Sequence, residues 1–167
     1  QQVQDGYLPA RVRELAPGGR RQRRLLARLG IAAGQVVTLD ELEAAVWEDD
    51  PPLTARHTIA AHVSRLRGLG LSIATAGEGY RLESPTDIQR FERLAAEGRQ
   101  ALAGDPRTAM LRLREALGVS RGQPCPDLEH LPARQIEAAR LEELVEGLRE
   151  DLLAVELDLG AQAEPVA

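Results

Sequence analysis

The sequence predicts a mainly α-helical protein built from two units, a helical unit that ends in a β-hairpin over residues 1–84 and an all-helical unit over residues 85–167. Apolar residues recur at three- and four-residue spacing through most of the chain, which is typical of helices with one buried face. Thr-x-x-Glu and Thr-x-x-Gln sequences indicate helix starts. Hydrophobic residues make up 43 % of the chain but aromatic residues only 2 %. The core must therefore consist of Leu, Val, Ile and Ala, a composition that favours helices.

Three helices are expected in the first unit, after a possible short strand at residues 12–15. The first helix, after Pro17-Gly18-Gly19, places three leucines on one face. The second begins at the capping box of Thr38 and Glu41 and ends at Trp47, and the third begins at Thr54 and ends near Gly68 or Gly70. The three leucines are Leu25, Leu26 and Leu29.

A hairpin is expected directly after the third helix. Residues 71–75 and 80–83 alternate in the manner of strands, and residues 76–79 contain the glycines of a turn. A helix with an exposed basic face followed by such a hairpin is the layout of a winged helix, in which the helix enters the major groove of DNA. The sequence therefore predicts a winged helix-turn-helix domain.

One side of the third helix suits contact with base edges. Ile59, Val63 and Leu66 cluster on the wheel and are expected to face the core. Thr58 and Ala61 are small enough to approach a thymine methyl group, and Arg65 could donate to guanine O6 and N7. We predict base contacts for Thr58, Ala61 and Arg65.

Other residues of this helix are better placed for phosphates, which orient a protein on DNA without reading its sequence. The alternative is that the arginines form an ordinary solvated helix face, but the hairpin that follows favours DNA. The predicted phosphate contacts are Arg56, His57, His62, Ser64 and Arg67.

Four arginines near the start of the first helix, Arg20, Arg21, Arg23 and Arg24, admit two interpretations. They could follow a phosphate backbone. They could also form the solvated side of an amphipathic helix, which we favour.

The charge is divided unevenly between the two units. All 21 basic residues are Arg, and the net charge is −5. Residues 1–85 carry 11 Arg against 10 Asp and Glu, whereas residues 86–167 carry 10 Arg against 16. This asymmetry suggests modules with different partners. DNA binding by the first unit would depend on a local basic face.

The second unit is expected to be a tetratricopeptide-like helical domain. Thr86 and Gln89 form a second capping box, and Asp105 with Pro106 starts the next helix. A long helix over residues 132–159 follows, and its apolar stripe could pack on the preceding helix hairpin or support self-association. We favour packing. The stripe consists of Leu141, Leu144, Leu148, Leu152, Val155 and Leu159.

No residue pattern indicates an enzyme, a metal site or a cofactor. His57 and His62 are five residues apart and so do not share a helix face as metal ligands do. Cys125 is a single cysteine without a partner motif, which excludes an intramolecular disulfide and suits a reducing cytoplasm. The longest apolar run is far shorter than the roughly 20 residues that span a membrane.

Long stretches of the chain resemble a known family of actinobacterial transcription activators. GGRRQRRLLARL, AGQVVTLDELEAAVWEDDPPLTARHTIAAHVSRLR and GEGYRL are similar to the OmpR-type winged helix of the Streptomyces antibiotic regulatory proteins. FERLAAEGRQALAGDP, LREAL and ARQIEAARLEELVEGLREDLLAVELDLG resemble the bacterial transcriptional activation domain that follows it. The resemblance extends over nearly the whole chain from about Gly18, with the two modules in the family order.

The resemblance implies a sequence-specific activator of a secondary-metabolite gene cluster, located in the cytoplasm with the nucleoid. It implies binding to direct repeats in promoter DNA, contact with RNA polymerase holoenzyme, and a possible homodimer. The matching wing residues are Thr75, Gly77, Glu78, Tyr80 and Arg81.

Two departures from the family pattern support an alternative function, a protein-interaction adaptor or a degenerate regulator that binds DNA weakly. Glu78 places a negative charge at the wing turn, where family members are often basic. The activation domain also stops early, as in a truncated domain.

Overall fold

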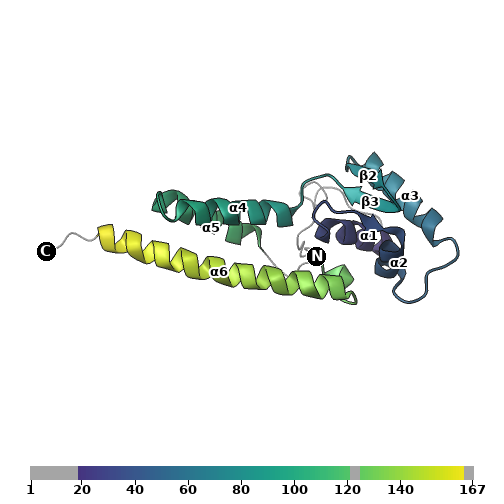
Figure 1. Ribbon diagram of the computed structural model, residues 1–167. Coiled ribbons are helices and arrows are strands. Elements are labelled where there is room, and N and C mark those ends of the chain that lie inside the picture. Colours follow the sequence, from purple (N-terminus) through teal and green to yellow (C-terminus); the bar gives the residue numbers. More distant parts are fainter. Residues whose placement is uncertain (1–18, 121–124, 164–167) are drawn as a thin grey trace.

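The computed structural model describes residues 19–120 and 125–163, and the expected strand at residues 12–15 lies outside these ranges. Figure 1 shows a winged-helix half at one end and a three-helix half that extends away from it. The expected fold, a winged helix followed by an all-helical domain, is confirmed. The elements in order are α1 (Arg20–Ile31), β1 (Val37–Thr38), α2 (Leu39–Trp47), α3 (Ala55–Gly68), β2 (Ile73–Ala76), β3 (Gly79–Leu82), α4 (Asp87–Ala101), α5 (Pro106–Val119), the 3₁₀ turn η2 (Pro126–Leu128) and α6 (Pro132–Ala163).

The three strands form one small antiparallel sheet in the order β1-β3-β2. Thr75 lies opposite Tyr80, and Thr38 lies opposite Gly79. A Cβ atom on Gly79 would lie 1.9 Å from the backbone oxygen of Val37, so this register requires glycine. The hairpin turn is tighter than expected, because only Gly77 and Glu78 separate the strands. Gly77 has a φ of 54°, a conformation that glycine adopts without steric cost.

The predicted helix starts are confirmed with one difference. Both capping boxes are present, and the Asp105 side chain accepts from the Thr108 backbone. Thr54 precedes α3 as expected, but its side chain makes no capping hydrogen bond. Its φ of −88° and ψ of 8° lie outside the extended region from which a capping oxygen reaches back to the helix.

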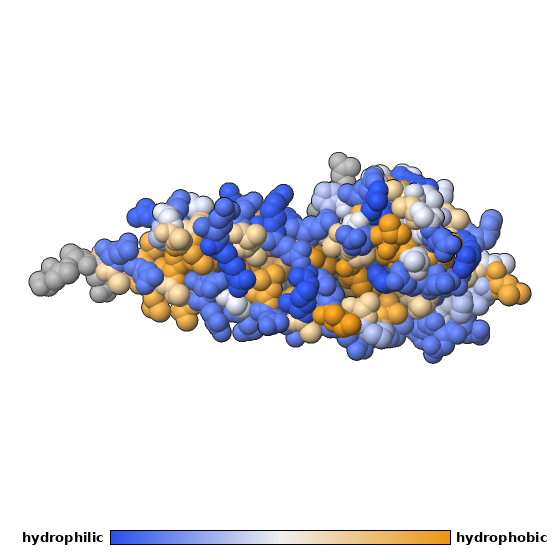
Figure 2. All heavy atoms as spheres, viewed as in Figure 1, coloured by the Kyte–Doolittle hydropathy of each residue, from blue (hydrophilic) through white to orange (hydrophobic). Residues whose placement is uncertain are grey.

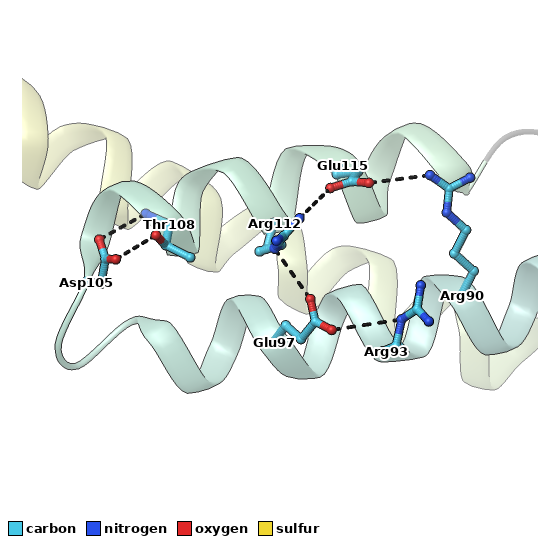
Figure 3. Close-up of polar contacts among 7 residues, drawn as sticks. All are labelled: Arg90, Arg93, Glu97, Asp105, Thr108, Arg112 and Glu115. Carbon is cyan, nitrogen blue, oxygen red and sulfur yellow. Dashed lines mark hydrogen bonds and ion pairs between the residues drawn. The ribbon is translucent and has the colours of Figure 1, made fainter.

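The helical half begins with the antiparallel pair α4 and α5. A Cβ atom on Gly98 would lie 2.8 Å from the buried side chain of Leu113, so the glycine allows the two helices to approach closely. Alternating charges span the outer surface of the pair (Figure 3). Glu97 and Glu115 each bind Arg112, at 3.4 Å and 3.0 Å, and Glu115 also binds Arg90 at 3.4 Å.

The long helix α6 packs along this pair through the stripe that the sequence predicts. Leu141, Leu148 and Val155 are buried, and the other three stripe residues pack partly buried against the same core. The stripe is therefore used within the chain, as we favoured.

Helix α1 joins the two halves because it is buried on two faces. Leu25, Leu26 and Leu29 belong to the winged-helix core. Ala27 and Ile31 belong instead to the core of the helical half. That second core also contains Cys125, whose burial raises the pKa of its thiol to about 12 and keeps it protonated.

The favoured interpretation of the arginine run is wrong for Arg24. Its side chain is only 8 % exposed and lies between the two halves. It donates to the backbone oxygens of Val46 and Asp127, each at 3.2 Å, and to Glu48 at 3.0 Å. A buried guanidinium needs such partners, since burial without them costs free energy. Arg24 therefore joins α2 to η2 rather than lying in solvent or along DNA.

Candidate nucleic-acid interface

Helix α3 presents a broad exposed surface beside the hairpin, at the end of the molecule away from α4 and α5 (Figure 1). Its inner face is apolar: Ala55, Ile59, Val63 and Leu66 are at most 2 % exposed. This burial fixes the rotation of the helix about its axis. The exposed residues are Arg56, His57, Ala60, Ser64, Arg65, Arg67 and Gly68.

The three residues predicted to contact bases share one side of α3, at spacings of three and four residues. Arg65 is exposed, whereas Thr58 and Ala61 are half-buried. The guanidinium of Arg65 therefore extends furthest from this side. Ala60 is also exposed and was missed by sequence reasoning, although its place one turn before Ser64 is a signal for it.

Arg56 is tied to α2 in this structure. Its guanidinium binds Asp40 at 2.9 Å and Glu43 at 3.1 Å. These ion pairs hold the first turn of α3 against α2. A phosphate would have to share or replace the two carboxylates.

His62 differs from His57 in its surroundings, because His57 is exposed and His62 is half-buried. Burial lowers the pKa of His62, and the nearby positive charges of Arg65 and Arg21 lower it further. The imidazole is therefore neutral at neutral pH, and its Nδ1 atom has no hydrogen-bond partner among the described residues. His62 can offer a phosphate a hydrogen bond but not a full charge.

The five predicted wing residues all lie in the hairpin or its turn. The turn is held to the rest of the sheet, because the Leu39 backbone N–H donates to the Glu78 oxygen at 3.0 Å. Arg81 pairs with Glu83 at 3.1 Å. The hydrogen bonds that Arg81 and Ser72 each donate to Glu83 lower the pKa of its carboxyl group. The hairpin thus has one arginine and two carboxylates near its surface, Arg81 against Glu78 and Glu83, and no net positive charge.

Arg67 lies in the last turn of α3 and faces the hairpin. It donates to the Ile73 backbone oxygen at 2.9 Å and to the Thr75 hydroxyl at 3.1 Å. Its guanidinium carbon is 5.9 Å from the centre of the Tyr80 ring. Arg67 therefore contacts three residues of the hairpin, which sequence reasoning did not anticipate.

Arg21 also has a role that the sequence did not reveal. Its guanidinium carbon lies 5.7 Å from the centre of the Trp47 ring, where a cation is attracted to the π electrons. This contact joins α1 to the end of α2. Arg21 nonetheless remains exposed.

Neither a metal site nor a membrane segment is found in the part of the chain that the structure describes. No group of three or more His, Cys, Asp or Glu side chains there could hold a metal ion. No helix within residues 19–120 and 125–163 has the length and apolar character needed to cross a bilayer.

Comparison with protein families assigns one family to each half. The family described as "Transcriptional regulatory protein, C terminal" matches residues 14–82. The family described as "Bacterial transcriptional activator domain" matches residues 86–167.

Curated relatives match nearly the whole chain but are themselves longer. Regulatory protein DnrI of Streptomyces peucetius is 32 % identical over 166 residues, which cover 89 % of this chain and 61 % of DnrI. Regulatory protein AfsR of Streptomyces coelicolor is 34 % identical over 161 residues, covering 92 % of this chain and 16 % of AfsR. The chain thus spans less than two thirds of the length of these relatives.

A solved structure shares the fold. "Mycobacterium tuberculosis EmbR in complex with low affinity phosphopeptide" superposes with a TM-score of 0.73 at 32 % identity. The match covers 86 % of this chain and 41 % of the EmbR chain. Both halves are thus found together in a transcriptional regulator of known structure.

Proposed function

Because the chain belongs to the Streptomyces antibiotic regulatory protein family of transcriptional activators, we propose that it binds promoter DNA through α3 and the β2–β3 hairpin. The family consists of transcriptional regulators, not enzymes. The observation that carries the proposal is the exposed surface of α3, where small side chains surround Arg65 beside a hairpin.

In the proposed complex α3 lies in the major groove. Arg65 reads guanine, and the half-buried Thr58 and Ala61 leave room for the base edges. His57 and Ser64, which are exposed on the same helix, contact phosphates. Arg56 and His62 remain candidates for phosphate contact, and the hairpin touches the backbone or the minor groove. Binding to direct repeats as a homodimer belongs to the same proposal.

The helical half is proposed to contact RNA polymerase holoenzyme. It carries the excess of negative charge. Figure 2 shows apolar patches on its largely hydrophilic surface. The side chains of Leu153 and Leu157, one turn apart on α6, are 59 % and 65 % exposed. A protein partner could cover such residues, and the activity would take place in the cytoplasm on the nucleoid.

A protein-interaction adaptor is the second candidate function. The same exposed leucines of α6 favour it, as do Glu78 at the hairpin turn and the pairing of Arg81 with Glu83. In that case the winged helix would have little affinity for DNA.

Titration with a random-sequence duplex at two salt concentrations tests whether the chain binds DNA at all. A protein that neutralises several phosphates should lose affinity by about a thousandfold or more between about 50 and about 200 mM salt. Retention on heparin at low salt should accompany this. Absence of binding at the lower salt concentration, together with a stable complex with a protein partner, would instead favour the adaptor.

A further inference from the structure

Strand β2 lies at the edge of the sheet, so only one of its sides is paired with another strand. The Glu83 backbone N–H, just after β3, donates to the Ser72 backbone oxygen. The oxygen of Ser72, the residue before Ile73, therefore points toward β3. Because backbone groups alternate in direction along an antiparallel strand, the Ile73 oxygen points to the unpaired side. Arg67 donates to this oxygen at 2.9 Å.

We propose that Arg67 is a positioning residue that holds the hairpin at a fixed place beside α3, a role that rests on the DNA-binding function proposed above. Its Nε and Nη2 atoms reach two hairpin residues in different directions, Ile73 and Thr75. Its guanidinium also lies beside the Tyr80 ring. Through these contacts the recognition helix and the wing meet DNA as one surface of defined geometry.

The short chain connection ties the start of β2 to α3, whereas Arg67 also reaches Thr75 and Tyr80 farther along the hairpin. The four residues 69–72 join the two elements, and Gly70 among them has a φ of 96°. Tyr80 lies on β3, opposite Thr75 on β2 and Val37 on β1. Arg67 therefore contacts both strands of the hairpin.

A lysine substitution at Arg67 distinguishes a positioning role from a phosphate-contact role. Arg67→Lys keeps the positive charge that a phosphate contact needs. A single ammonium group lacks the planar fork that reaches Ile73 and Thr75 together. A phosphate-contact role is thus largely rescued by lysine, whereas a positioning role is not.

The first arm of the test measures amide hydrogen exchange in the full chain without DNA. Arg67→Ala and Arg67→Lys should each speed exchange in residues 73–82 by about tenfold, equivalent to a free-energy change of about 1.4 kcal/mol, and leave residues 87–163 unchanged. Thr75→Val, which removes one acceptor, should produce a smaller change in the same segment. Arg65→Ala is the matched control, because this exposed arginine of α3 should leave exchange in the hairpin unchanged.

The second arm measures affinity for a duplex that the wild-type chain binds specifically. Arg67→Lys should lose about as much affinity as Arg67→Ala, about tenfold. Wild-type exchange and near-wild-type affinity for Arg67→Lys would overturn the proposal and leave Arg67 as a phosphate contact. If the wild-type chain binds no DNA, the proposed function fails, while the exchange arm still decides whether Arg67 holds the hairpin.

Discussion

Arg65 is the residue on which base recognition by α3 most depends. Arg65→Ala should cost on the order of 1–3 kcal/mol of binding free energy on a specific site, because a bidentate contact to guanine is lost. The preference for one base pair should relax at the same time. Titrations with the specific duplex and with single-base variants of it measure both effects.

The control for this change is Arg93→Ala in the helical half. Arg93 is also an exposed helical arginine, and it lies 3.9 Å from Glu97 on the same helix. Its loss should leave DNA binding nearly unchanged. Equal loss of affinity on specific and random duplexes for Arg65→Ala would contradict base recognition by Arg65.

At the residue scale, the sequence predicted the burial or exposure of side chains whose neighbours lie within the same helix. The buried and exposed sides of α3 follow from the spacing of Ile59, Val63 and Leu66, all within one helix. The role of Arg24 could not be predicted in the same way. It donates to oxygens of residues 22 and 103 positions away. A helical wheel of α1 does not show such long-range contacts.

At the scale of elements, the close approach of α4 and α5 depends on Gly98. Gly98→Ala should lower the free energy of unfolding by about 1–3 kcal/mol, because the added Cβ atom would overlap the buried Leu113 side chain. Chemical denaturation of the full chain measures this effect.

Gly118→Ala provides the matched control on α5. This glycine is exposed in the helix, and an added Cβ atom would meet nothing within 4 Å. Since alanine favours helix over glycine by up to about 1 kcal/mol, Gly118→Ala should stabilise the protein slightly. Equal effects of the two substitutions would show that Gly98 has no special packing role.

Helix starts were the elements that the sequence predicted best. The two capping boxes form hydrogen bonds between residues three positions apart, Thr38 with Glu41 and Thr86 with Gln89. A short stretch of sequence is therefore enough to show their pattern. The hairpin turn was predicted as four residues and has two, because Ala76 pairs with Gly79 and Gly79 also pairs with Thr38 of β1. That pairing joins residues about 40 positions apart, which local patterns do not report.

For the whole molecule, Arg24 forms the more buried of two polar contacts at the junction of the two halves. Arg24→Ala should lower the free energy of unfolding by about 2–4 kcal/mol, because the Val46 oxygen loses its donor in a buried place and the Asp127 oxygen loses its donor in a half-buried one. Denaturation followed by far-ultraviolet circular dichroism measures the change.

Arg23→Ala is the control at the same junction. Arg23 is 3.7 Å from Asp127, and both side chains are about one third exposed. Such a pair contributes at most about 1 kcal/mol. If Arg24→Ala destabilised the protein no more than Arg23→Ala, the two halves would be joined mainly by the apolar packing of α1 into both cores.

The central claim, that α3 and the hairpin recognise a specific DNA sequence, is tested most directly by selection from random duplex DNA. We expect enrichment of a repeated motif whose affinity falls steeply with salt. Its half-site spacing would also report how two copies of the chain are arranged on DNA. No enrichment, with only weak binding that disappears near physiological salt, would contradict the account.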